Sequence, residues 1–171
     1  MIAGMTELRS ILDELLTTTG ASRVTLRRDD PGDYAFPVVE ESLSPGTGSL
    51  REERTVDLRT QPVVRELAQG RQVVQDDCRA AFDDPAFHAM LATYGGLAAQ
   101  IVTPVVVGAK LEAIVSVHHL GSPRRWTEAE ITAARQAAIR VRGWTGLPPS
   151  TQTSSTTVTI LRTWSSPIER A

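Results

Sequence analysis

The stretch that most limits the fold of this chain is residues 100–135, because it holds strand, turn and helix signals in a fixed order. Two β-prone runs, 101–107 and 111–120, are separated by the short loop Gly108-Ala109-Lys110. Two such runs around a glycine-containing loop are typical of a β-hairpin. Gly121-Ser122-Pro123 then breaks the second strand. The sequence therefore predicts a long antiparallel pair followed directly by a new element.

That new element is predicted to be a helix, and its first residues carry a capping signal. Thr127 and Glu130 have the spacing of a capping box, in which each side chain satisfies a backbone N–H of the other residue. Trp126 precedes the cap and is expected to pack over the start of the helix as a structural residue.

The chain before this stretch carries weaker but regular patterns. Apolar residues recur at helical spacing over 7–19, with Thr6 as the predicted N-cap and Gly20 just after the last turn. Val24 and Leu26 alternate with polar residues, which is typical of a half-covered strand. The remaining predicted elements are strands over 22–28, 34–41 and 71–75 and helices over 61–70 and 84–94.

Residues 148–171 differ in composition from the rest of the chain. Residues 150–157 read STQTSSTT, a low-complexity linker, and 158–163 read VTILRT, which alternates and is β-prone. Three hypotheses stay open for this tail: a disordered segment, an extra edge strand, or a strand exchanged with another subunit.

The order of features in the hairpin and its helix resembles the C-terminal half of a GAF domain. These features are Pro104 and Gly108, a hydrophobic strand that ends in His118-His119, and then Pro123-Arg124-Arg125-Trp126-Thr127 with Glu130. The resemblance extends from about Leu8 to Trp144. It implies an α/β (α+β) fold with a central antiparallel sheet of about five or six strands, helices on one face and a ligand pocket on the other. We assign residues 1–147 to this domain.

Bulk properties exclude several classes of function. A net charge of −2 and a pI near 5.9 give no basic surface for nucleic acid. No apolar run approaches the roughly 20 residues needed to span a bilayer, and no signal peptide is visible, so a cytoplasmic protein is expected. Cys78 is the single cysteine, which excludes an internal disulfide and metal sites built on several thiolates.

Alternation along 111–120 predicts which side chains face a ligand. Leu111, Ala113, Val115, Val117 and His119 share one face, which is apolar until its end and should meet the helices. The other face mixes apolar and polar groups as a pocket does, and the candidates there are Ile114, Ser116 and His118. A single β-bulge would exchange the roles of His118 and His119.

Four further residues complete the predicted ligand-binding set. Tyr94 and Thr103, together with Gln100, are expected to supply polar contacts, and His88 to lie near the roof of the pocket. Cys78 is included by position, although the carboxylates of Asp76 and Asp77 would raise its thiol pKa and make it a poor nucleophile. No metal is assigned and the cofactor is left open.

The sequence lacks the motifs of several GAF domains whose chemistry is known. GAF photoreceptors attach bilins through a cysteine next to a histidine, whereas Cys78 is followed by Arg79. The several cysteines of GAF-like methionine sulfoxide reductases and the Asn-Lys-Phe-Asp-Glu signature of cyclic-nucleotide GAF domains are missing. Two alternatives stay open: haem ligation by His118, and a cation site or merely a solvated loop formed by Asp76, Asp77, Asp83 and Asp84.

The function that this resemblance implies is a sensor that binds a small organic molecule. Because no output domain is visible, we expect a stand-alone module that acts as a homodimer or through a separate output protein, without nucleic acid or membrane. The alternative from another class is an enzyme that uses the pocket with His118 as acid/base. A third hypothesis is a structural dimerisation module whose pocket is filled by its own side chains.

Overall fold

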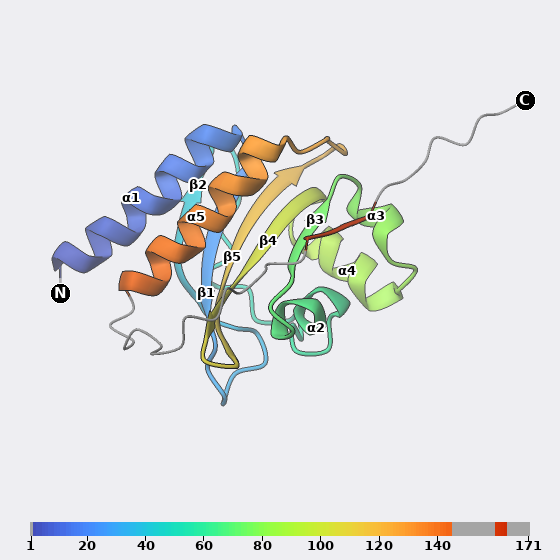
Figure 1. Cartoon of the computed structure of the whole chain (residues 1–171). Helices are drawn as coiled ribbons and strands as arrows, with labels where there is room; N and C mark the ends of the chain where they lie inside the picture. The colour runs from blue at the N-terminus through green and yellow to red at the C-terminus, as the bar shows by residue number, and fades with distance from the viewer. Residues whose placement is uncertain (1, 145–159, 164–171) are drawn as a thin grey trace, which may run out of the picture.

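The computed structural model describes residues 2–144 and 160–163, and its centre is a single six-stranded sheet (Figure 1). The strand order is β2-β1-β5-β4-β3-β6. All pairs from β2 to β3 are antiparallel, which confirms the predicted antiparallel sheet and α+β class. The strands are β1 (Arg23–Arg28), β2 (Val38–Leu43), β3 (Gln72–Gln75), β4 (Leu97–Val107), β5 (Lys110–Leu120) and β6 (Ile160–Thr163).

The long hairpin of β4 and β5 is the core of the sheet, as the sequence predicts. Val107 pairs with Lys110, so Gly108 and Ala109 form a two-residue turn. Gly108 has φ = +63°, a conformation that glycine adopts without strain. β1 lies on the free side of β5 and β3 on the free side of β4.

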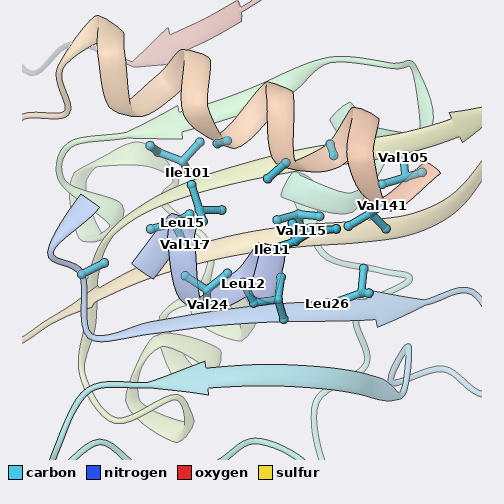
Figure 2. Close-up of a cluster of buried hydrophobic side chains, with 14 of the residues drawn as sticks. Ile11, Leu12, Leu15, Val24, Leu26, Ile101, Val105, Val115, Val117 and Val141 are labelled. Carbon is cyan, nitrogen blue, oxygen red and sulfur yellow. The ribbon is translucent and has the colours of Figure 1, made fainter. Parts of the chain in front are cut away.

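One face of the sheet is covered by two long helices that lie side by side, α1 (Ile2–Thr19) and α5 (Glu128–Trp144) (Figure 1). Aliphatic side chains of both helices interdigitate with those of the strands (Figure 2). Helix α1 begins four residues before the predicted cap, so the N-cap prediction for Thr6 is wrong. The predicted end is correct, because Gly20 follows with φ = +57°.

The opposite face carries a second core under shorter elements. The helices there are α2 (Pro62–Ala68), α3 (Cys78–Ala81) and α4 (Pro85–Thr93), with the connection from Ser44 to Gln61 between them and β2. Helix α3 was not predicted, because a single turn has no apolar periodicity. Asp77 stabilises this turn by accepting hydrogen bonds from the N–H groups of Arg79 and Ala80.

Two other boundaries have clear local causes. The predicted strand over 34–41 begins only at Val38, because Phe36 takes φ = +50° and Pro37 follows it. The capping box of α5 is confirmed: Glu130 N–H donates to Thr127 Oγ1 at 3.2 Å, and Thr127 N–H donates to Glu130 Oε2 at 2.8 Å. Trp126 is fully buried beside this cap, as expected.

Strand β6 adds a parallel edge next to β3, with Gln72 opposite Ile160 and Gln75 opposite Thr163. Residues 145–159, which hold the predicted linker and the end of the assigned domain, lie outside the described residues. No helix in the described part of the chain is long and apolar enough to cross a membrane.

Candidate functional site

A cavity lies between the sheet and the α2–α4 layer, on the face where the pocket was expected. Its volume, as the space open to the centres of water-sized molecules, is about 40 Å³. The floor comes from β1, β4 and β5, and the walls from α2, α4 and the residues just before α2. The lining residues are Arg27, Leu58, Gln61, Val63, Val64, Leu67, Met90, Tyr94, Gln100, Val102, Ile114, Ser116 and His118.

Strand β5 presents the predicted face to this cavity. Ile114, Ser116 and His118 line it, whereas Val115 and Val117 belong to the helix-covered core. The β-bulge at this end of the hairpin lies in β4 at Ala98, so the alternation of β5 holds from Ala113 to His119. At the other end, Glu112 of β5 has no partner in β4, and Leu111 packs against the second core, so its predicted place on the helix-covered face is wrong. Hence His118 faces the cavity side and is buried, and His119 is half-buried on the other side.

Tyr94 is the fourth predicted residue in the lining, and it organises the polar end of the cavity. It is the C-cap residue of α4. Its ring stacks on the imidazole of His118, with centroids 5.9 Å apart and planes at 27°. Gln100 also lines the cavity, and its Nε2 donates to Gln75 Oε1 at 2.8 Å.

The other three predicted ligand-binding residues are not brought into the lining. Thr103 lies on the helix-covered face, where its hydroxyl accepts from Gln72 Nε2 at 3.0 Å. His88 lies on the outer side of α4, with Nε2 3.1 Å from the carbonyl oxygen of Arg79. Cys78 is fully buried in the second core.

Arg23 and Arg27 are the side chains of the candidate site that the sequence did not reveal. Polar residues of an alternating strand normally face water, but β1 lies between β2 and β5 and both of its faces are covered. Arg23 is 1% exposed and Arg27 is 3% exposed. The alternation of β1 was the signal that could have indicated them, since it places Arg23 and Arg27 on the face opposite to Val24 and Leu26.

Arg23 joins three parts of the site through one guanidinium. Its Nη2 donates to the carbonyl oxygen of Tyr94 at 2.8 Å, and its Nη1 donates to that of Gly48 at 2.9 Å. Its Nε and Nη2 lie 3.2 and 3.1 Å from Nδ1 of His118. Burial lowers the pKa of Arg23 to about 10, against the opposing effect of Glu41, so the group stays charged at neutral pH.

Arg27 holds the other side of Tyr94. Its Nη1 donates to the carbonyl oxygens of Ala35 and Phe36 at 2.9 and 2.8 Å, and its Nη2 donates to Tyr94 Oη at 3.3 Å. Burial is the largest cause that lowers the pKa of Arg27, and Tyr94 and Glu53 oppose it. Burial also raises the pKa of the Tyr94 phenol, so Tyr94 stays neutral.

These contacts determine the protonation of His118. Arginine has only N–H donors, so Nδ1 of His118 must be an acceptor and the ring proton must sit on Nε2. Burial, then Arg23 and Arg27, lower the pKa of His118 well below its usual value. His118 is therefore a neutral hydrogen-bond donor toward the cavity side. This state leaves no lone pair on Nε2 for a proton or a metal.

The acidic residues near α3 and α4 have structural tasks. Asp77 and Asp84 cap α3 and α4, and Asp76 Oδ1 accepts from the backbone N–H of Trp126 at 3.0 Å. Among the described residues, no three His, Cys, Asp or Glu side chains are grouped as a metal site. Helix capping thus accounts for Asp77 and Asp84, and a backbone hydrogen bond accounts for Asp76.

The chain belongs to the GAF family, because the GAF domain model matches residues 6–142. This confirms the family that the hairpin motifs indicate. No curated protein sequence matches the chain.

Solved structures confirm the fold. The blue-light absorbing form of the Thermosynechococcus elongatus PixJ GAF domain superimposes with a TM-score of 0.66 at 21% identity, covering 82% of this chain and 86% of that one. The photoproduct state of GAF3 from Slr1393 of Synechocystis sp. PCC6803 gives 0.63 at 21%, covering 82% and 94%. A phycocyanobilin-bound GAF domain from a cyanobacterial phytochrome gives 0.66 at 19%, covering 82% and 85%.

Proposed function

We propose that this protein is a sensory module that binds a small organic molecule in the cavity between the sheet and α2–α4. The observation that carries the proposal is the lining, in which an apolar wall meets a few convergent polar groups. One of these groups, Gln61 Oε1, is buried and has no hydrogen-bond partner among the described residues.

The size of the cavity argues for a ligand much smaller than a bilin. A cavity of about 40 Å³ does not admit a tetrapyrrole without displacement of α2 or α4. The thiol that a bilin would need is also unsuited. Cys78 is 0% exposed, and burial raises its pKa, with a further contribution from Asp77. The phycocyanobilin of the structural neighbour is therefore not part of our proposal.

The enzyme alternative, with His118 as acid/base, gains no support from the site. A histidine whose Nδ1 accepts from Arg23 and whose pKa is low is a poor base near neutral pH. The cavity lining also lacks an ionisable carboxylate or thiol that would pair with it. A neutral Nε2–H donor suits ligand recognition better than proton transfer.

We propose that the helices α1 and α5 transmit the effect of ligand binding to a partner. These helices cover the face opposite to the cavity, and Ile139 of α5 is 70% exposed although it is a large apolar residue. We propose that the pair contacts a second copy of the chain or a separate output protein. Sedimentation velocity of wild type and Ile139→Lys tests the homodimer: the variant is expected to shift a dimer to monomer.

Native mass spectrometry of the purified protein, followed by extraction and a ligand-observed NMR screen of neutral and anionic fragments, tests the binding function. We expect a bound small molecule or fragment hits that are lost in Ser116→Leu, whose larger side chain takes up the cavity space. Ser122→Leu, on the exposed turn after β5, is the matched control. Hits that persist equally in both variants, or no binding at all, would contradict the proposal.

A further inference from the structure

The inner face of β1 places two permanent cations in a buried layer beside the cavity. In the described part of the chain, neither Arg23 nor Arg27 forms an ion pair with a carboxylate, and both are almost fully buried. A buried charge is costly unless it is paired or well hydrogen-bonded. The structure therefore holds two buried cations on which the nearby carboxylates, Glu41 and Glu53, act without direct contact.

The two arginines differ in how far the protein satisfies them. Arg23 uses all its nitrogens on His118, Gly48 and Tyr94, and Glu41 lies near enough to oppose the fall of its pKa. Arg27 makes three donations, two from Nη1 and one from Nη2. Guanidinium has five N–H groups, so two of those on Arg27 lack an acceptor among the described residues.

Arg27 also lines the cavity, and two further donors lie on the same floor. The hydroxyl of Ser116 and Nε2–H of His118 come from β5, the strand paired with β1. Neither group has a hydrogen-bond partner in the described part of the chain. The opposite wall, from α2, is aliphatic: Val63, Val64 and Leu67. The site thus offers donors and positive charge on one side and apolar surface on the other.

We propose that the ligand is a small organic carboxylate, bound through Arg27 with Ser116 and His118 as neutral donors and with its apolar part against α2. This inference rests on the proposed function and names the ligand class for the same cavity. A planar carboxylate matches the fork of a guanidinium and accepts several hydrogen bonds, whereas a neutral ligand would not pair with the charge of Arg27, on which Glu53 acts without direct contact. The small volume favours an acid with a short apolar part.

The test compares each acid with its uncharged amide of nearly equal shape. Ligand-observed NMR in Tris chloride at neutral pH measures the binding of each probe. The acids are acetate, propionate, isobutyrate and benzoate, and their respective amides are acetamide, propionamide, isobutyramide and benzamide. We expect at least one acid to bind at least tenfold more tightly than its amide. We expect Arg27→Gln to weaken that acid by about tenfold to a hundredfold, the usual contribution of a charge-assisted hydrogen bond.

Arg28→Gln is the matched control, because Arg28 is the next residue on the same strand but is exposed. It should change the affinity by less than twofold. If Arg27→Gln does not fold, Ser116→Ala is the second variant and should weaken the acid while leaving the amide unchanged. Both variants are checked by circular dichroism before titration.

Each other outcome contradicts the proposal in a recognisable way. Equal affinities for the acids and their amides would contradict a carboxylate as the ligand class, but would still support the proposed function of binding a small molecule. Absence of binding by all acids and all amides would count against the ligand class and the proposed function together.

Discussion

At the scale of single residues, Arg23 is the hub of the polar layer. It is the second largest of the fully buried side chains, and its guanidinium links β1 to β5, to the end of α4 and to the loop at Gly48. Its removal would leave the carbonyl oxygens of Gly48 and Tyr94 without their donor. A buried acceptor that loses its donor costs about 1–3 kcal/mol.

We therefore expect Arg23→Ala to lower the free energy of unfolding by about 3–5 kcal/mol. Urea denaturation followed by circular dichroism measures this change. Arg28→Ala, five residues further on the same strand and exposed, should stay within about 0.5 kcal/mol of the wild type. Equal effects of the two substitutions would show that the buried network around Arg23 stabilises nothing.

His118 makes stability depend on pH in a defined direction. Its pKa is lowered in the folded protein by burial, then by Arg23 and Arg27, so the unfolded chain binds the proton more readily. Its contribution is complete above the unfolded pKa of about 6.5 and is lost as the pH falls below that value. The loss is up to about 1.4 kcal/mol per pH unit.

Urea denaturation at pH 8, 7, 6 and 5 measures this effect when the wild type is compared with His118→Gln. The difference in unfolding free energy between the two proteins should shrink as the pH falls from 7 to 5. His119→Gln is the control for the second titrating ring, whose pKa is lowered by burial and Arg124. A difference that is constant with pH would contradict a neutral, buried His118.

The residues of the site divide into those that the sequence could and could not indicate. Alternation along β5 is a strictly local signal, and it places Ile114, Ser116 and His118 on the cavity side. Arg23 and Arg27 follow the same alternation, but whether their face meets water or a second layer depends on α2 and α4, which lie far away in the chain. Burial of a charged strand face is a tertiary property.

At the scale of elements, the starts of α4 and α5 were predictable from local signals. A cap is a bond between residues three positions apart, so the capping box of Thr127 and Glu130 and the cap at Asp84 are visible in the sequence. The start of β2 was not visible, because nothing local announces the positive φ of Phe36. Helix α1 also extends beyond its predicted cap at Thr6, since Ile2 to Met5 continue the helix.

The cap of α4 gives a test at this scale, because α4 carries Met90 and Tyr94 into the cavity wall. Asp84 Oδ1 accepts from Phe87 N–H at 2.9 Å. Asp84→Ala is expected to cost about 1 kcal/mol and to speed amide hydrogen exchange in the first turn of α4. Asp83→Ala removes a neighbouring exposed carboxylate and should change neither quantity. Faster exchange in both variants would point to lost charge rather than a lost cap.

At the scale of the whole molecule, one sheet separates two apolar cores with different tasks. The core under α1 and α5 is built from aliphatic side chains of both helices and the strands (Figure 2). The core under α2 and α4 contains the cavity and the buried polar layer. Successive residues of β4 and β5 point alternately into the two, so one strand serves both.

This separation predicts that equal deletions in the two cores have equal effects on stability and different effects on binding. Val115 lies in the core under α1 and α5, and Val102 lines the cavity from the neighbouring strand. Val115→Ala and Val102→Ala each remove two methyl groups from a buried side chain, which should lower the unfolding free energy by roughly 2–3 kcal/mol. Urea denaturation of both variants checks this part.

The binding part uses the same two variants and the probe acids. Val102→Ala enlarges the cavity, so the affinity for benzoate should rise relative to that for acetate, because a ring gains contacts that a methyl group does not reach. Val115→Ala should leave this ratio unchanged, since the sheet stands between its side chain and the cavity. A ratio that shifts equally in both variants would mean that the two layers are not independent. In that case, occupation of the cavity would be coupled through the sheet to the α1–α5 pair, the face proposed to carry the signal.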